Sequence, residues 1–476
     1  MQEGWSRRIG DRVVRRPRER EVTPIVIRTT PRRHPSRFIR SPFILMIGFG
    51  ILILVGGGLL LLPVANNEGS MTPPLVAFFT STSAVTVTGL VLEDTATYWS
   101  SFGQGVVFAL MGLGGLGFMT TATFFLVLIG QRITLPERLL MRESLMANRL
   151  GGLVRLTRYV VLTAVLFYLA GTGLFFWRFH QPFGDIQGLW QSAFHAVSAF
   201  NNAGFSIIPG SASLSAYRTD YVLLGIFTAL IILGGISYTV LVEVFRGHRP
   251  RRYSLDTKLV LVVSALLWAL GLGVIFGSEF FNEHTLGKLP LGGKVFTAFF
   301  HSVSARTAGF STVDFGQSGD FTNLFVVALM FIGGAAGSTA GGIKINTFAV
   351  LMVAVFSSIR GRLHAEAFGR EIPHVQVHRA LAIAVLGLLL IGAVVLFLTL
   401  YEKDIPFPKL LFQTVSAFGT VGLSTGIMGE MSLAGKVLII IAMFVGRLGP
   451  LTLALALAPG EEREVYRFVQ ERVKIG

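Results

Sequence analysis

Four stretches of this sequence follow one pattern, and they read SAVTVTGLV (83–91), SAFNNAGFS (198–206), VSARTAGFS (303–311) and SAFGTVGLS (416–424). Each contains a glycine followed by a large apolar residue, and these glycines, Gly89, Gly204, Gly309 and Gly422, lie 115, 105 and 113 residues apart. A short apolar segment precedes each stretch, at about 73–85, 187–199, 293–304 and 407–417. Such segments are too short to cross a bilayer and are typical of re-entrant helices. The chain therefore contains four copies of one unit.

Longer apolar segments flank each short one. A crossing helix needs about 20 apolar residues, and eight segments are candidates, at about 43–63, 101–130, 157–179, 220–245, 256–280, 322–357, 377–401 and 434–458. Each unit is a span, a short helix, a glycine loop and a second span, over residues 43–130, 157–245, 256–357 and 377–458. An even number of spans separates the units, so they run in parallel about an axis along the membrane normal. We predict an all-α polytopic membrane protein with four parallel span–pore-helix–span repeats in a pseudo-fourfold arrangement around a central ion pore.

The composition supports a membrane protein. Of 476 residues, 52% are hydrophobic and 14% charged, whereas soluble globular domains carry roughly 25% charged residues. The absence of cysteine excludes a disulfide framework, a thiolate zinc site and a cysteine nucleophile. The net charge of +15 is compatible with nucleic-acid binding, but the basic residues lie in short segments between apolar runs, so we expect no nucleic-acid partner.

The charges also predict an orientation. The segments 131–158, 246–258 and 359–379 are rich in Arg and Lys, and an eight-span layout places all three on one side. Positive residues favour the cytoplasmic side, so we expect a multi-pass protein of the cell (inner) membrane with both termini in the cytoplasm.

Both ends of the chain differ from its apolar middle. Residues 1–42 contain twelve Arg and four acids, and no early apolar core of a signal peptide. They are either a mobile, Arg-rich cytoplasmic arm or a segment that binds anionic lipid. The C-terminal tail, 459–476, is expected to be cytoplasmic.

The glycine loops predict a cation pathway. Backbone that is not helical at membrane depth is tolerated only inside protein or along a water-filled path. Rings of carbonyl groups replace the hydration shell of a cation, and the C-terminal ends of the short helices favour positive charge. Glycine lets the backbone approach the axis with positive φ. Simple helix packing explains one such glycine, but four evenly spaced copies favour a pore.

The sixth span is too long for one straight crossing and is interrupted by GGAAGSTAGG (333–342). Small residues of this kind suit an unwound segment that lines a cavity, and the alternative is a small-residue packing face. Arg447 lies inside the last apolar segment, where a charge is costly. We expect it to face the pore below the glycine loops and to donate to the broken segment, and the alternative is a snorkelling side chain. Lys344 has the same two interpretations.

Several motifs are decoys. GLGGLG (112–117) matches a dinucleotide fingerprint and GLSTG (422–426) a nucleophile elbow, but neither lies between a strand and a helix. His195 and His301 precede their glycines by nine and eight residues, so they do not occupy matching positions and are expected in core or helix-end roles. The chain has no HExxH or Walker motif, and we expect no enzyme activity.

The combination of motifs resembles the Trk/Ktr/HKT superfamily of potassium transporters, and within it the membrane subunit of a Ktr-type system. The resemblance covers about 40–476 and rests on TSAVTVTGL (82–90), GGLGFMT (114–120), SARTAGFST (304–312), GSTAGGIK (337–344) and GRLGPLT (446–452). It implies that carbonyls of four loops form a potassium filter, and Gly89 implies potassium preference because Ser there accompanies sodium preference in plant relatives. The implied filter residues are Val87, Thr88, Gly89, Asn202, Ala203, Gly204, Thr307, Ala308, Gly309, Thr420, Val421 and Gly422.

The resemblance also implies a gate, an intramembrane loop below the filter. Its residues here are Gly333, Gly334, Gly337, Ser338, Thr339, Gly341, Gly342 and Lys344, together with Arg447. Ala335 and Ala336 stand where relatives often have Ser and Pro, which leaves the conformation of the loop open.

Partners and ions follow from the same resemblance. It implies a homodimer with one pore in each protomer and a cytosolic ring of nucleotide-binding regulatory subunits (KtrA-like). We expect no cofactor in this chain and potassium as the transported ion, and sodium is a candidate activator or coupling ion. The alternatives are an obligatory sodium–potassium symporter and a membrane scaffold without transport activity.

Overall fold

The structure is a computed structural model that describes residues 41–117, 153–209, 213–247 and 249–449. All of these residues belong to one compact unit, Ile39–Gly476. The predicted N-terminal arm, except for its last two residues, and the predicted C-terminal tail lie outside the described residues. The same holds for the ends of two predicted spans, 118–130 and 450–458.

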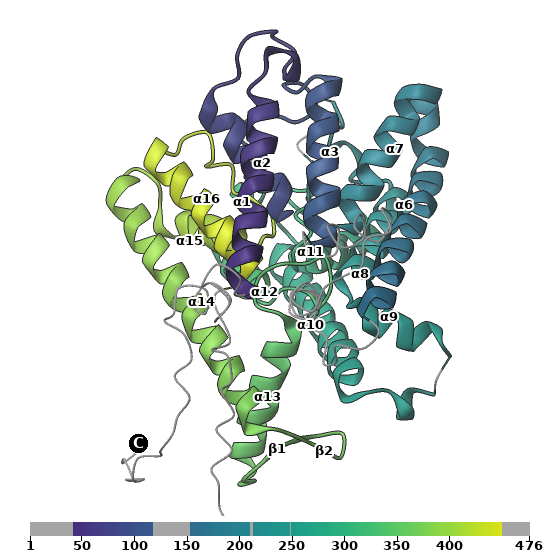
Figure 1. The fold of residues 1–476 in the computed structure, drawn as a ribbon, viewed down its shortest axis with the longest axis vertical. Coiled ribbons are helices and arrows are strands. Elements are labelled where there is room, and N and C mark those ends of the chain that lie inside the picture. The colour runs from purple at the N-terminus through teal and green to yellow at the C-terminus, as the bar shows by residue number, and fades with distance from the viewer. Residues whose placement is uncertain (1–40, 118–152, 210–212, 248, 450–476) are drawn as a thin grey trace, which may run out of the picture. The chain divides into compact units, whose positions relative to one another are not determined.

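Helices form most of the described part (Figure 1). The range of the first predicted unit holds α1 (Ser41–Leu60), η3 (Pro63–Ala65), α2 (Pro74–Thr86) and α3 (Ser101–Leu116). The second holds α6 (Leu153–Phe183), α7 (Asp185–Phe200), η4 (Ser215–Tyr217), α8 (Tyr221–Gly235) and α9 (Tyr238–Phe245), followed by η5 (Pro250–Arg252). The third holds α10 (Leu255–Glu279), α11 (Leu291–Ser304), η6 (Phe315–Gln317), α12 (Asp320–Phe331) and α13 (Ile345–Ile359), and the fourth α14 (His374–Tyr401), α15 (Phe407–Phe418) and α16 (Leu433–Leu448).

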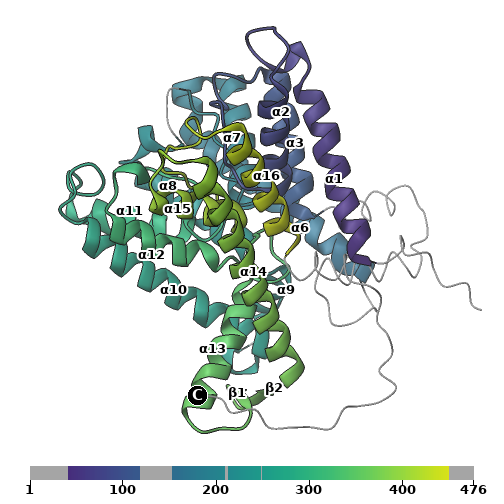
Figure 2. The same cartoon turned by 90° about the vertical axis from the view of Figure 1, so that its left-hand side faces the viewer.

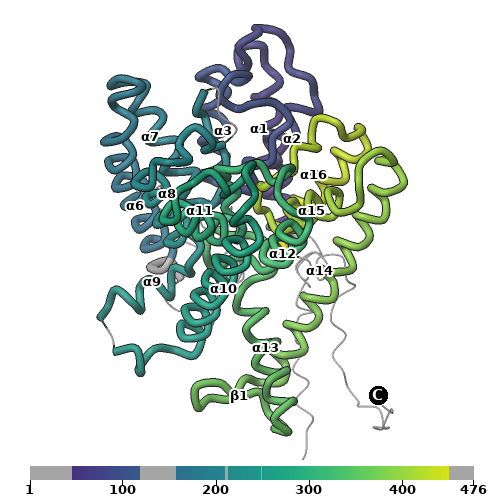
Figure 3. Tube along the Cα trace, turned by 180° about the vertical axis from the view of Figure 1, so that it is seen from behind, coloured from purple at the N-terminus to yellow at the C-terminus, as the bar shows by residue number. Residues whose placement is uncertain are grey.

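A small hairpin joins α13 to α14. Its strands, β1 (Ala365–Ala367) and β2 (Arg370–Ile372), are antiparallel, with Glu366 opposite Glu371. Figures 2 and 3 show the hairpin, α13 and the neighbouring end of α14 together at one end of this unit.

The four predicted short segments are confirmed as helices α2, α7, α11 and α15. The residues that precede them, Pro73, Gly184, Pro290 and Pro406, resist extension of a helix. The C-terminal turns of these helices are buried. Their hydroxyl groups, such as those of Thr82, Thr86 and Thr414, donate to the carbonyl four residues earlier, so these polar side chains need no water.

Fewer helices than predicted are long enough to cross a membrane. Among the described residues, Thr157–Phe183, Leu255–Glu279 and His374–Tyr401 are long and apolar enough, and α8 with α9 makes a fourth if the bent pair is one span. α1, α2, α3, α12 and α13 are shorter apolar helices in the described part. Eight crossings therefore remain a prediction.

The sequence predicted continuous helices over 101–130, 220–245 and 434–458, and the structure shows a break inside the second of these ranges. α8 and α9 are bent by 104° at the break between them, where Ser237 begins α9 by accepting from the backbone N–H of Thr239. Hydropathy alone does not detect this break, because the helices on both sides of it are apolar. In the described parts of the other two ranges, α3 ends before Gly117 (φ +82°) and α16 before Gly449 (φ +87°).

Close backbone contacts explain the glycines in the last turns of α3, α8 and α16. A Cβ atom on Gly114 would lie 2.0 Å from the carbonyl oxygen of Val85, and one on Gly234 would lie 1.7 Å from that of Phe200. Gly446 approaches Phe418 in the same way, at 1.9 Å. Each of these carbonyls belongs to the C-terminal end of a short helix, four residues before a loop glycine. Only glycine therefore lets the second helix pack against that end.

Candidate filter and gate

The four glycine loops share an unusual backbone conformation. Positive φ occurs at Val87, Asn202, Thr307 and Thr420 (56°, 57°, 77° and 49°), and again two residues later at Gly89, Gly204, Gly309 and Gly422 (87°, 71°, 74° and 94°). A β-branched residue with positive φ is an outlier and costs about 1–3 kcal/mol, so the surrounding structure must enforce it. The same strained turn at equivalent places indicates that the four backbones follow similar paths.

The loops also contact one another in a closed cycle. A Cβ atom on Gly89 would lie 2.4 Å from the carbonyl oxygen of Ala203, and one on Gly204 would lie 3.0 Å from that of Ala308. A Cβ atom on Gly309 would lie 2.2 Å from the carbonyl oxygen of Val421. One on Gly422 would lie 2.1 Å from the carbonyl oxygen of Thr88, which belongs to the first loop and closes the cycle. Each glycine thus faces the carbonyl of the residue before the next glycine. The implied filter residues of all four loops therefore lie together.

Serine side chains hold all four loops in shape. The hydroxyl of Ser83 accepts from the N–H of Gly89 at 3.0 Å, and that of Ser416 accepts from the N–H of Gly422 at 3.2 Å. The hydroxyl of Ser198 donates to the carbonyl of Phe205 at 2.7 Å, and that of Ser304 donates to the carbonyl of Phe310 at 2.5 Å. Sequence reasoning missed this role, although these serines lie five or six residues before their glycine.

The broken segment of the third unit forms a closed loop between α12 and α13. The N–H of Gly333 donates to the carbonyl of Ile343 at 2.8 Å, and that of Ile345 donates to Gly334 at 3.0 Å, which joins the two ends. Gly337 and Gly342 have positive φ, and the hydroxyl of Ser338 donates to Ala335 inside the loop. The predicted interruption is therefore present, and it is a loop rather than a helical packing face.

This loop binds the end of α8 and touches two filter loops. The N–H and the hydroxyl of Thr339 donate to the carbonyl of Gly234, at 3.2 and 3.0 Å. The same hydroxyl lies 3.2 Å from the carbonyl oxygen of Phe200, at the end of α7. A Cβ atom on Gly341 would lie 2.0 Å from the hydroxyl of Thr420, and one on Gly333 would lie 3.3 Å from the methyl of Thr307.

Three cationic side chains donate to carbonyls of the loop. Arg447 donates to Thr339, as predicted, and also to Gly114 and Gly115 at the end of α3. The Nζ atom of Lys344 donates to Ala340. Arg306, which the sequence analysis did not single out, donates to Gly333 at 3.0 Å. Its charge inside an otherwise apolar motif was the available signal.

The two histidines have structural partners. His195 is hydrogen-bonded to the carbonyl of Gln191 at 2.7 Å and to the hydroxyl of Ser206 at 3.1 Å, and His301 to that of Thr312 at 3.0 Å. Within the described ranges, no group of three or more His, Asp or Glu side chains is arranged to hold a metal ion. The oxygen atoms that the four loops offer are those of backbone carbonyls and hydroxyls, which suit an alkali cation better than a transition metal.

A family model described as "Cation transport protein" (TrkH) matches residues 35–465. The chain belongs to the TrkH family.

Relatives in this family align over most of the chain. The Ktr system potassium uptake protein B of Bacillus subtilis is 40% identical over 89% of this chain and 94% of its own length. The potassium/sodium uptake protein NtpJ of Enterococcus hirae is 36% identical over 90% of this chain and 96% of its own length. The Ktr system potassium uptake protein B of Vibrio alginolyticus is 37% identical over 88% of this chain and 92% of its own length. These TrkH-family relatives are named as uptake proteins, not as enzymes.

The fold is also that of a solved member of the TrkH family. The crystal structure of the potassium transporter TrkH from Vibrio parahaemolyticus superposes with a TM-score of 0.69, at 19% identity, over 91% of this chain and 87% of the other. The likeness shows that the two proteins share an overall fold.

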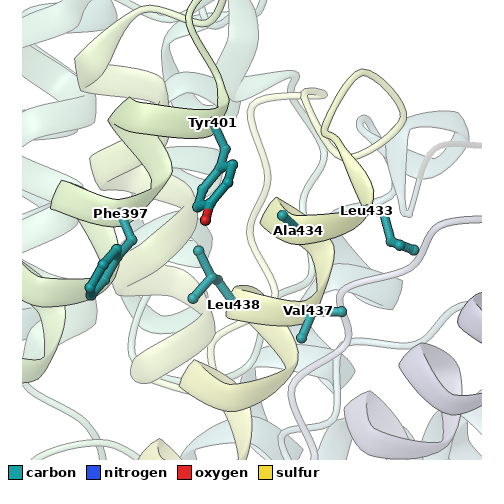
Figure 4. Close-up of a pocket in the computed structure, with 6 residues that line it drawn as sticks. All are labelled: Phe397, Tyr401, Leu433, Ala434, Val437 and Leu438. Carbon is teal, nitrogen blue, oxygen red and sulfur yellow. The ribbon is translucent and has the colours of Figure 1, made fainter.

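An apolar groove of about 400 Å³ lies away from the filter residues, between α14 and α16 (Figure 4). Phe397 and Tyr401 line it on one side, and Leu433, Val437 and Leu438 on the other. None of the predicted filter or gate residues contributes to it. In a TrkH-family protein such an exposed apolar groove suits lipid chains rather than an ion.

Proposed function

We propose that this protein takes up potassium across the cell membrane through the four glycine loops. The observation that carries the proposal is the closed cycle of contacts between these loops, in which each glycine faces a carbonyl of the next loop. Carbonyl oxygens arranged around an axis replace the water shell of a permeating cation. The names of the TrkH-family relatives support potassium as that cation.

In this mechanism potassium enters from outside, loses water to the filter and continues past the loop between α12 and α13. The membrane potential drives it inward, at about 2.3 kcal/mol per charge for each 100 mV. The filter consists of the twelve residues of the four loops, in a pseudo-fourfold arrangement of parallel repeats. The loop is the gate, and the positive charges of Arg447 and Lys344 raise the barrier in the closed state.

The protein is also proposed to act in an assembly. Two relatives are named as protein B of a Ktr system, which supports a homodimer that binds a separate cytosolic, nucleotide-binding regulatory ring. Basic cytoplasmic loops offer that ring, or anionic lipid, an electropositive surface. Both termini are placed in the cytoplasm in this proposal.

A sodium-coupled symporter is the second candidate function. It is favoured by one observation, namely that the relative from Enterococcus hirae is named as a potassium/sodium uptake protein. A scaffold without transport activity is disfavoured, because such a scaffold does not need four strained carbonyl loops in mutual contact.

Uptake of rubidium or potassium into proteoliposomes that contain this chain alone, with and without sodium, tests the proposal. Uptake in both conditions is expected for a passive potassium pathway, and uptake only with sodium would favour coupling or activation. The regulatory ring is added if the chain alone is inactive. No uptake even then would reject transport.

A further inference from the structure

Arg306 is buried at the point where the third short helix meets the third glycine loop. It is 5% exposed and lies three residues before Gly309. The other three loops have Thr86, Asn201 and Gly419 at this place, so only the third loop carries a charge. A charge at membrane depth is costly and marks a functional position more often than a packing one.

The partners of Arg306 are a carbonyl and an aromatic ring. Its Nη2 donates to the carbonyl of Gly333 at 3.0 Å, and its Cζ lies 5.7 Å from the centre of the Trp268 ring on α10. Its Nε has no hydrogen-bond partner, and no carboxylate of the described residues forms an ion pair with it. The Gly333 contact is therefore the one direct hydrogen bond that the structure gives this guanidinium among the described residues.

Gly333 is the base of the gate loop, because its N–H donates to Ile343 on the returning strand of the loop. The next residue after Arg306 is Thr307, whose positive φ belongs to the filter conformation and whose methyl faces Gly333. Arg306 thus joins the first residue of the gate loop to the first strained residue of the third filter loop. Arg447 differs, since its acceptors lie in the middle of the gate loop and on α3, and none belongs to a filter loop.

We propose that Arg306 is a positioning residue that couples the gate to the filter. With the loop closed, the hydrogen bond to Gly333 and the cation–π contact with Trp268 hold the guanidinium and fix the backbone of Thr307. When the base of the loop moves, this hydrogen bond breaks and the third filter loop loses its support. A cavity of about 20 Å³ beside Arg306, Trp268 and Gly334 is large enough for one water molecule, which can replace the carbonyl during this movement. The inference rests on the proposed function.

The test compares Arg306→Met with Arg447→Met as the matched control, since both remove a cation that donates to the gate loop. Initial rates of rubidium uptake into proteoliposomes give the maximal rate and the KM, and competition by sodium gives selectivity. Arg306→Met is expected to raise both the maximal rate and the KM, the KM by about fivefold or more, with weaker discrimination against sodium. Arg447→Met is expected to raise the maximal rate with a KM within about twofold of the unmodified protein.

A conservative series separates coupling from a general loss of structure. Arg306→Lys keeps the charge without the planar fork and is expected to give an intermediate KM. If Arg306→Met does not fold, Trp268→Leu is compared with Trp268→Phe, and the KM is expected to rise only in the former, because phenylalanine retains an aromatic face. An unchanged KM and selectivity in the Arg306 variants, or in Trp268→Leu where those do not fold, overturns the coupling while leaving transport intact. Absence of uptake by the unmodified protein, with the regulatory ring present, overturns the proposed function and this inference with it.

Discussion

At the scale of single residues, the strain in the filter loops is concentrated at a few backbone positions. Val87, Thr307 and Thr420 are β-branched and still have positive φ. Such residues are retained only where neighbouring groups over-determine the backbone. Here those neighbours are the next loop of the cycle and the serine hydroxyls at the base of the loops.

Gly422→Ala is expected to weaken potassium binding strongly. Its new Cβ would meet the carbonyl oxygen of Thr88 at 2.1 Å, and a backbone carbonyl in the neighbouring loop cannot move aside without changing the filter. We expect the KM for rubidium uptake to rise by about tenfold or more, equivalent to about 1.4 kcal/mol.

Gly426→Ala is the matched control for this prediction. Gly426 has a similar φ of +85°, but a Cβ there meets nothing within 4 Å. Both variants carry the left-handed strain of about 1–2 kcal/mol, so their difference reports the contact alone. Equal KM values for the two variants would show that the approach of Gly422 to Thr88 does not matter for ion binding.

At the scale of elements, the gate loop is held by hydrogen bonds to carbonyls and by close glycine contacts. Its ends are joined to each other, its middle is bonded to α7 and α8, and cationic side chains from the third filter loop, the start of α13 and α16 donate to it. No carboxylate partner of these cations is present in the described part. Backbone carbonyls bind a cation less tightly than a carboxylate does, which suits a loop that must open.

Gly341→Ala is expected to hold this loop away from the filter. The added methyl would lie 2.0 Å from the hydroxyl of Thr420. The closed position of the loop is therefore disfavoured, and the initial rate of ion uptake rises several-fold. In a Thr420→Ala background the same change should raise flux much less, because the two nearest atoms, the Oγ1 and Cγ2 of Thr420, are gone. Equal effects in both backgrounds, measured as initial uptake rates, would mean that the contact does not control the gate.

Arg447→Met is expected to increase flux, because it removes both a positive charge from the pathway and the hydrogen bond to Thr339. Arg447→Lys keeps the charge but lacks the planar fork that reaches Thr339 and Gly114 together. Its flux should therefore lie between that of the unmodified protein and that of Arg447→Met. Unchanged or reduced uptake by Arg447→Met would reject a barrier at this residue.

At the scale of the whole molecule, a buried acid at the end of the first helix of a unit contacts the start of the helix that follows the glycine loop, in two units. Glu279 at the end of α10 is 3% exposed and accepts from Gly319 at 2.9 Å and from Thr322 at the start of α12. Glu402 after α14 accepts from the N–H and hydroxyl of Ser432, which begins α16, at 2.9 and 2.6 Å. Each carboxylate lies at the N-terminus of the helix that it contacts, where the helix dipole stabilises a negative charge.

Glu279→Ala is expected to lower the stability of the whole protein by about 2–4 kcal/mol, since it removes the carboxylate that accepts from four donors, two of them buried hydroxyls. Besides Gly319 and Thr322, the donors are Asn282 at 2.7 Å and Thr285 at 2.6 Å. The midpoint of thermal unfolding in detergent measures the effect. Glu283→Ala, an exposed acid four residues further on, is the control, and equal midpoints would show that the buried carboxylate contributes nothing.

The sequence determined the repeat, the short helices and the glycine positions, because these follow from local properties. Apolar segment length, spacing and the preference of glycine for positive φ act within a few residues of the chain. The interruption at 333–342 was predictable for the same reason, since five of its ten residues are glycine, which is unfavourable inside a helix. The contact of Arg447 with it was predicted on a different ground, the cost of a charge inside an apolar segment.

Three features depend on long-range packing: which loop faces which, where α8 and α9 part and what binds Arg306. The approach of Gly234 to Phe200 joins residues 34 positions apart, and that of Gly422 to Thr88 joins the two ends of the described chain. Such contacts depend on the packing of several helices at once, and no periodicity within one segment encodes them. Arg306 illustrates the limit, because its charge was visible in SARTAGFS, whereas its acceptor, Gly333, comes into reach only when α11 and α12 both pack against α10.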